Sequence, residues 1–174
     1  MDQLGESTQQ RLLKSAKTLF AQRGYEQTST AAIARDAGTS ESQLVRHFGG
    51  KRGLLSAVFD QAWRVLNEQI AQRVRKTTDP IAAIETMFAT ITEAFHRDQD
   101  LAYLFLFEGR RIREGGRHLE LSEGYREFAR SLHQLIRAAQ RTERIAKGIS
   151  TAALAAALMG AAEGMMRDAM IAKL

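Results

Sequence analysis

The stretch that decides the fold is residues 28–48, which read TSTAAIARDAGTSESQLVRHF. Its pattern predicts two short helices joined by a tight turn at Gly38. Thr28 is the expected N-cap of the first helix and Ser40 that of the second, because a side-chain oxygen can accept a backbone N–H there. Ser40 and Gln43 also fit a capping box, in which Gln43 reaches back to the Ser40 amide. The exposed side chains of the second helix are then predicted to be Ser40, Glu41, Ser42, Gln43, Arg46 and His47.

Amphipathic helices are predicted on both sides of this stretch. The preceding helix starts at Ser7 or Thr8 and ends at Gly24, and the following helix runs from about Lys51 to Lys76. The preceding helix carries one apolar stripe of Leu12, Leu13, Ala16, Leu19 and Phe20. This arrangement is the helix-turn-helix plan, in which the second short helix enters the major groove of DNA.

Composition and periodicity predict that the rest of the chain is helical too. Hydrophobic residues make up 44% of the 174 residues, charged residues 26%, and there is one proline, at the start of a predicted helix. The further helices are predicted to begin at Asp79-Pro80, to span Asp100 to about Arg113, to span about His118 to Thr142, and to begin near Ser150. We therefore expect an all-α fold, with the helix-turn-helix head followed by a helical bundle.

Other classes of protein find little support. The absence of cysteine excludes disulfide scaffolds and thiolate zinc sites and favours a cytoplasmic location. The most apolar run, residues 149–162, is too short to span a bilayer, so no membrane partner is expected. Glu93 and His96 form half of a di-iron helix motif without a second half. Phosphate-binding glycine loops and nucleophile elbows are missing, so we expect no enzyme, cofactor or metal.

Net charge gives only weak support for an anionic partner. The whole chain carries +5, but residues 1–60 hold eight Lys and Arg against six Asp and Glu, a net +2. Contact with DNA must then come from a shaped face and not from bulk charge. A helical interaction module that does not bind DNA remains an alternative, because small three-helix bundles also serve in protein–protein contacts.

The head resembles that of the TetR family of bacterial transcription regulators over residues 8–60. The resemblance implies a DNA-binding domain at 7–66 and a ligand-sensing, dimerising domain at 67–174. It rests on Arg11-Leu12-Leu13, Ala16, Leu19-Phe20, Gly24-Tyr25, Thr28-Ser29, Ile33-Ala34, Ala37-Gly38-Thr39-Ser40, Leu44, His47-Phe48, Lys51 and Leu54-Leu55. The DNA-binding residues are predicted to be Thr28, Ser29, Thr39, Ser40, Ser42, Gln43, Arg46, His47 and Lys51.

The sequence departs from the family pattern on and around the second short helix. Val45 stands where the family usually has a tyrosine that touches a phosphate, and Gln43 where it has a small residue or threonine. Arg52 replaces a usual glutamate, while Thr30 and Thr39 replace usual valines. These differences affect the expected operator sequence more than the expected docking mode.

By the same resemblance, the body is expected to bind a small molecule and to form a homodimer. Most aromatic residues on a helical stripe are core residues, so a ligand would contact only a subset of them. The candidate ligand-binding residues are Trp63, Phe88, Phe95, Tyr103, Phe105, Tyr125 and Phe128. The candidate dimer residues are Leu154, Leu158, Gly160, Ala161, Gly164 and Met165, for which an intramolecular core is the alternative.

The prediction as a whole is a sequence-specific transcription regulator. We expect its partners to be a palindromic double-stranded DNA operator, a small-molecule effector and a second copy of the chain. Repression with release by the effector is the expected mode, because an occupied promoter excludes polymerase, and activation stays open.

Overall fold

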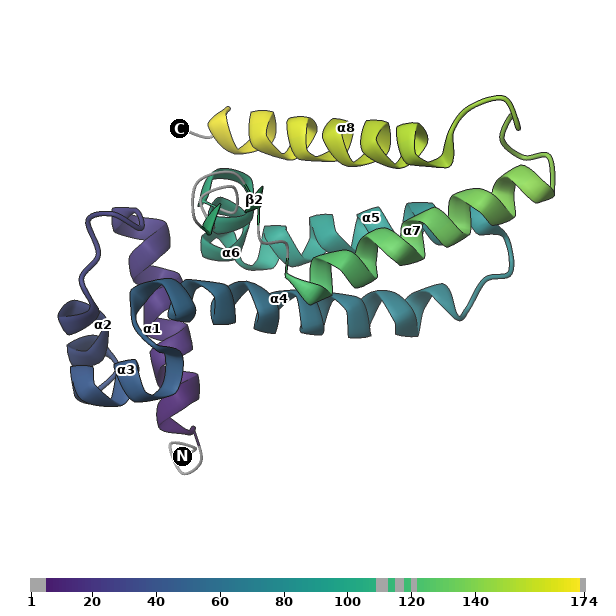
Figure 1. The fold of residues 1–174 in the computed structure, drawn as a ribbon. Helices are drawn as coiled ribbons and strands as arrows, with labels where there is room; N and C mark the ends of the chain where they lie inside the picture. Colours follow the sequence, from purple (N-terminus) through teal and green to yellow (C-terminus); the bar gives the residue numbers. More distant parts are fainter. Residues whose placement is uncertain (1–5, 109–112, 115–117, 120–121, 173–174) are drawn as a thin grey trace. The chain divides into compact units, whose positions relative to one another are not determined.

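The computed structural model describes residues 6–108, 113–114, 118–119 and 122–172 (Figure 1). The prediction of an all-α fold is confirmed, and the strands described are one short antiparallel pair, Arg113 with Leu119 and Glu114 with His118. The elements in chain order are α1 (Thr8–Arg23), α2 (Thr30–Asp36), α3 (Glu41–Phe48), α4 (Lys51–Val74), α5 (Pro80–Arg97), α6 (Gln99–Tyr103), the π-helix η1 (Leu104–Glu108), β1 (Arg113–Glu114), β2 (His118–Leu119), α7 (Glu123–Arg141) and α8 (Thr151–Ile171).

Contacts between residues divide the chain into two compact units. The first comprises Met1–Ala62 with Asp98–Ser122, and the second comprises Trp63–Arg97 with Glu123–Leu174. The predicted domains at 7–66 and 67–174 stay a prediction, because contact units do not establish which part folds or acts by itself.

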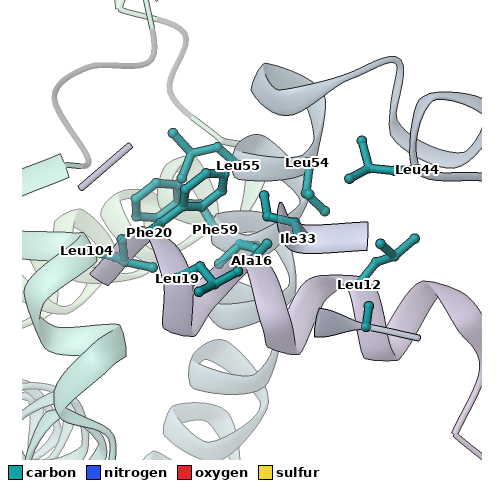
Figure 2. Close-up of a cluster of buried hydrophobic side chains, with 12 residues drawn as sticks. Leu12, Ala16, Leu19, Phe20, Ile33, Leu44, Leu54, Leu55, Phe59 and Leu104 are labelled. Carbon is teal, nitrogen blue, oxygen red and sulfur yellow. The ribbon is translucent and has the colours of Figure 1, made fainter. Parts of the chain in front are cut away.

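The first unit is built around the inner face of α1. Leu12, Ala16, Leu19 and Phe20 recur at helical spacing and are buried against α2, α3 and the start of α4 (Figure 2). Leu104, from the distant η1 segment, is fully buried in the same cluster. The partners from α2, α3 and α4 are Ile33, Ala37, Leu44, Leu54, Leu55, Val58 and Phe59.

The start of α1 is fixed by a capping box. The Ser7 hydroxyl accepts the Gln10 N–H at 3.2 Å, and the Gln10 side chain accepts the Ser7 N–H at 2.8 Å. These two bonds satisfy backbone donors that a helix start otherwise leaves without partners. The predicted start at Ser7 or Thr8 is confirmed, and α1 ends before Gly24 as expected.

The second unit packs α5 and α8 against α7, beside the second part of α4 (Figure 1). An aromatic cluster lies inside it, with the Trp63 ring 5.2 Å from that of Phe128 and 5.6 Å from that of Tyr125. Phe88 meets Phe128 edge-on at 6.2 Å. The Tyr125 hydroxyl donates to the Met159 Sδ atom at 3.8 Å, which links α7 to α8. The predicted cap of α5 is confirmed, since Asp79 accepts the Ile81 N–H at 3.1 Å.

Two predicted helix boundaries are wrong. The α-helix expected from Asp100 to Arg113 is the shorter α6, which ends at Tyr103. The π-helix η1 follows it, and Arg113 lies in the strand β1. The helix expected from His118 begins at Glu123 instead, and His118 pairs in β2. Residues 109–112 of the first of these predictions lie outside the described residues.

No helix in the described ranges combines the length and the apolar character needed to cross a membrane.

Candidate nucleic-acid interface

The helix-turn-helix consists of α2, a tight turn and α3. Gly38 has a φ of +62°, a conformation that costs glycine little and other residues more. The turn is closed by the Thr39 N–H, which donates to the Ala34 carbonyl oxygen at 2.9 Å. These constraints set the direction in which α3 leaves the turn.

The caps of these two helices differ in part from the prediction. Ser40 is the N-cap of α3 as expected, and its hydroxyl accepts the Gln43 N–H at 3.3 Å. Ser29, and not Thr28, caps α2, because its hydroxyl accepts the Ala32 N–H at 3.1 Å. The predicted return bond from Gln43 to the Ser40 amide is absent among the residues described, so the Gln43 amide group is not used as a cap.

Thr28 is buried and has a structural role in the head. It is 1% exposed, and its hydroxyl donates to the carbonyl oxygens of Gly24 at 2.8 Å and Leu19 at 3.1 Å. These bonds tie the end of α1 to the start of α2. A buried hydroxyl cannot reach a phosphate, so the predicted contact of Thr28 with DNA is not supported by its position.

The outer face of α3 carries polar and basic side chains. Ser42, Arg46 and His47 are exposed and Gln43 is half-buried, while Leu44 points inward and is fully buried. Within residues 6–108, no hydrogen bond or ion pair engages the side chains of Gln43 and Arg46. Both amide and guanidinium groups are therefore available to an external partner.

The other exposed groups at the start of α3 have partners inside the head. The Glu41 carboxylate accepts a hydrogen bond from the Thr30 hydroxyl, which joins the first turns of α3 and α2. Ser42 shares a hydrogen bond of 2.9 Å with Ser40. Thr30, one of the departures from the family pattern, thus fixes the position of an acidic group beside the exposed face of α3.

Lys51 anchors the start of α4. Its Nζ donates to the carbonyl oxygens of Tyr25 at 3.0 Å and Glu26 at 3.4 Å, and lies 4.4 Å from the centre of the Tyr25 ring. Burial, with a smaller effect of the Glu26 charge, raises the pKa of the Tyr25 hydroxyl, while the Arg52 charge lowers it. The ammonium group holds the 25–26 turn and leaves one of its three donors for another acceptor.

Gly53 is a structural residue that the sequence reasoning missed. A Cβ atom built on it would lie 1.8 Å from the Phe48 carbonyl oxygen, which is far inside contact distance. Only glycine therefore permits α4 to start this close to the end of α3. A glycine in the first turn of a predicted helix was the available signal, since it weakens a helix unless space requires it.

The candidate ligand-binding residues do not form one group. Trp63, Phe88, Tyr125 and Phe128 form the aromatic cluster of the second unit, and Phe95 is buried on α5. Tyr103 and Phe105 belong to the first unit, where Phe105 contacts Phe59.

A cavity of about 210 Å³ opens in the second unit between α4, α5 and α7. None of the seven candidate ligand-binding residues lines it. Its polar lining was missed because these side chains lie at the edges of the apolar stripes. The cavity is lined by Asn67, Ile70, Ala71, Val74, Met87, Glu127, Ser131, Gln134 and Leu135.

The candidate dimer residues lie on a helix that is largely open. Ala155 is the buried residue of α8, whereas Gly160 and Ala161 are exposed and Met165 is 67% exposed. A Cβ atom built on Gly160 or Gly164 would meet no atom within 4 Å. Leu154 and Leu158 are half-buried.

The isolated Glu-x-x-His sequence of α5 has a different environment from that of a metal site. The Glu93 carboxylate pairs with Arg73 at 2.9 Å and with Arg97 at 3.1 Å. Across the part of the chain that the structure describes, no three His, Asp or Glu side chains gather where they could hold a metal ion.

Comparison with known proteins bears on this arrangement. Residues 12–58 match the family model of bacterial regulatory proteins, tetR family. The matched region contains most of α1, all of α2 and α3, and the first residues of α4. The HTH-type transcriptional regulator UidR of Escherichia coli strain K12 is 24% identical over 171 residues, which cover 94% of this chain and 82% of that protein.

Other relatives match a part of the chain or the fold alone. The nucleoid occlusion factor SlmA of Pasteurella multocida strain Pm70 is 29% identical over 98 residues, or 56% of this chain, and the match spans about half of that protein, 49%. The structure of AibR in complex with isovaleryl coenzyme A and operator DNA has a TM-score of 0.74 and 18% identity, covering 97% of this chain and 98% of AibR. Residues 12–58 of this chain are therefore similar to the tetR family, and the whole chain shares the fold of AibR.

Proposed function

We propose that this protein is a sequence-specific DNA-binding transcription regulator that acts as a dimer and responds to a small molecule. The observation that carries the proposal is the outer face of α3, where Gln43 and Arg46 present uncommitted side chains on a rigidly capped helix-turn-helix. The match of the head to the family model supports it. Such a helix fits the major groove, which is about 12 Å wide.

Bases and phosphates would be contacted by different residues. Arg46 suits the two acceptors of guanine, and Gln43 suits the donor and acceptor of adenine. Ser29, Thr39, Ser40, Ser42, His47 and Lys51 lie at helix starts or beside the exposed face and suit phosphate oxygens. Because phosphate contacts release counterions, the affinity for DNA should fall steeply with salt.

The dimer would form through α8. Four small residues, Ala153, Ala157, Gly160 and Gly164, recur along this helix at spacings of three or four. Open space over both glycines within one chain is what a closely packed second copy would fill. Two-fold symmetry then predicts a near-palindromic operator, with half-sites about 34–36 Å apart.

The cavity of the second unit is the candidate effector site. Its lining combines the buried Ile70 and Met87 with the polar groups of Asn67, Glu127 and Gln134, a combination that suits an amphipathic small molecule. AibR, which shares the fold, binds an acyl coenzyme A and operator DNA. We propose that an effector here favours a conformation that binds DNA less well, so that repression is relieved.

Selection of sequences bound by the full chain from a random DNA pool tests the DNA-binding function. We expect a palindromic consensus, and Arg46→Ala should lower affinity for it by about ten-fold or more, since a bidentate contact is worth about 1–3 kcal/mol. Arg64→Ala removes the same charge from an exposed position on α4 and serves as the control. No enrichment at low salt from a folded protein would exclude DNA binding and favour an interaction module.

The effector hypothesis has a separate test. A thermal-shift panel of small amphipathic molecules should yield a stabilising compound that releases the selected DNA. Ala71→Trp would occupy the cavity from an exposed lining position and should abolish the shift without weakening DNA binding. A compound that still binds this variant would place the effector elsewhere.

A further inference from the structure

Val45 is an exposed apolar side chain on α3, the second helix of the helix-turn-helix. It is 50% exposed, whereas the preceding Leu44 is fully buried. The other large hydrophobic residues with comparable exposure in the described ranges, Val65, Ile149, Met165 and Ile171, belong to the second unit. In the first unit, this exposed apolar surface therefore coincides with the helix proposed to enter DNA.

Neither helix formation nor core packing explains a valine here. β-Branched side chains lose rotamer freedom in a helix, so many polar residues would suit an exposed position as well or better. Leu44 and the half-buried Phe48 supply the inward contacts of α3. Burial of Val45 against a partner would remove its apolar surface from water, which is favourable.

The polar residues one turn before Val45 are bound within the head. On a helix, Val45 lies one turn after Glu41 and Ser42. Glu41 is bound to Thr30 and Ser42 to Ser40, so both polar groups are held by the head. Arg46, the adjacent residue, is exposed.

We infer that Val45 contacts the C5-methyl group of a thymine and thereby reads a T·A pair next to the bases read by Gln43 and Arg46. The inference rests on the proposed DNA-binding function. In the major groove, the thymine methyl is the apolar group that the base pairs present, and small apolar side chains recognise it. Valine has no hydrogen-bonding group, so it gains nothing from the polar edges of the other bases.

Deoxyuridine substitution tests the inference with a change of one methyl group. The full chain is titrated with its selected operator and with duplexes in which each symmetric pair of thymines is replaced by deoxyuridine. At one symmetric pair, the loss of two methyl groups should weaken binding by roughly fifteen-fold, about four-fold for each buried group of this size. Elsewhere the replacement should change affinity little.

The variant Val45→Ala identifies the residue that makes the contact. It should bind the thymine operator more weakly than the wild type and no longer distinguish thymine from deoxyuridine at that pair. Val65→Ala, a truncation at a position 42% exposed on α4, should keep full discrimination. Thermal unfolding of both variants should match the wild type, because each removed group is exposed.

The outcomes separate this inference from the proposed function. Specific binding without a thymine preference, or discrimination that survives in Val45→Ala, overturns the inference and leaves the DNA-binding function intact. A consensus with no thymine within a half-site also overturns it. Failure to select any sequence overturns both.

Discussion

The backbone of Gly124 packs directly against the side chain of Trp63. A Cβ atom built on Gly124 would lie 2.4 Å from the Trp63 Cβ and 3.3 Å from its Cγ. Beside this contact, the Asn67 side-chain amide donates to the Gly124 carbonyl oxygen at 2.9 Å. The first turn of α7 is therefore held against α4 at a distance that no larger residue permits.

Gly124→Ala should destabilise the second unit. The added methyl group must push α7 away from Trp63, and overpacking of this kind costs about 1–3 kcal/mol. Trp63 is the one tryptophan in the sequence, so its fluorescence during urea unfolding measures the change directly. Gly148→Ala, in the turn before α8 where a Cβ would meet no atom within 4 Å, is the control and should leave stability nearly unchanged. Equal stability of the two variants would contradict the close contact.

Gly53→Ala should damage the head. An alanine in a helix normally gains about 0.5–1 kcal/mol over glycine, but here its Cβ would collide with the Phe48 carbonyl oxygen. We expect a loss of at least ten-fold in affinity for the selected operator, because α3 must shift to relieve the collision. Ser56→Ala, in the next turn of α4, tests for a general effect of substitution in this helix. Unchanged DNA affinity in Gly53→Ala would show that the junction can relax freely.

Tyr125 should ionise later than an ordinary tyrosine. Burial, and next the charge of Glu163, raises the pKa of its hydroxyl above the usual 10.0. The folded state thus favours the neutral phenol, and this contribution to stability is complete below pH 10 and lost as pH rises through the raised pKa. The difference in tyrosinate absorbance between wild type and Tyr125→Phe, recorded against pH, should have a midpoint above 10. A midpoint at or below 10 would show that the hydroxyl is solvated.

The variants Gly160→Leu and Gly164→Leu should separate the proposed dimer while leaving each chain folded. Within one chain the new side chain has open space, so only a second copy would be displaced. Sedimentation equilibrium should show the dissociation constant of the dimer rise by about ten-fold or more. Ala152→Leu, at an exposed position in the first turn of α8, is the control. Dimers that survive all three substitutions would place the interface elsewhere.

The helices of the head could be predicted from sequence because each has both a periodic apolar stripe and its own end signals. Ser7, Ser40 and Gly24 mark the boundaries of α1 and α3 where the structure has them. Thr28 and Ser29 are adjacent hydroxyl residues, and only the burial of Thr28 in three dimensions decides that Ser29 is the cap.

The segment after α6 could not be predicted for a physical reason. Residues 104–107 read LFLF, a run without polar positions and so without a period to interpret. The π-helical turn buries Leu104, Leu106 and Glu108, which are every second residue. An α-helical pattern does not predict this alternation, and a strand is not expected in the middle of a helical chain. The cavity was missed in a similar way, because polar residues of α4 and α7 meet there only after folding.

The first unit is built from two separate segments of the chain, and this matters for the design of chimeric proteins. Leu104 completes the core of the head, and Asp98, which caps α6 by accepting the Leu101 N–H, also forms an ion pair with Lys17 of α1. A chimera that transplants residues 1–62 onto a foreign body would bring neither group along. Such a graft would leave an apolar hollow against Phe20 and an orphaned lysine, so an exchange of operator specificity between relatives should carry the 98–108 segment with the head.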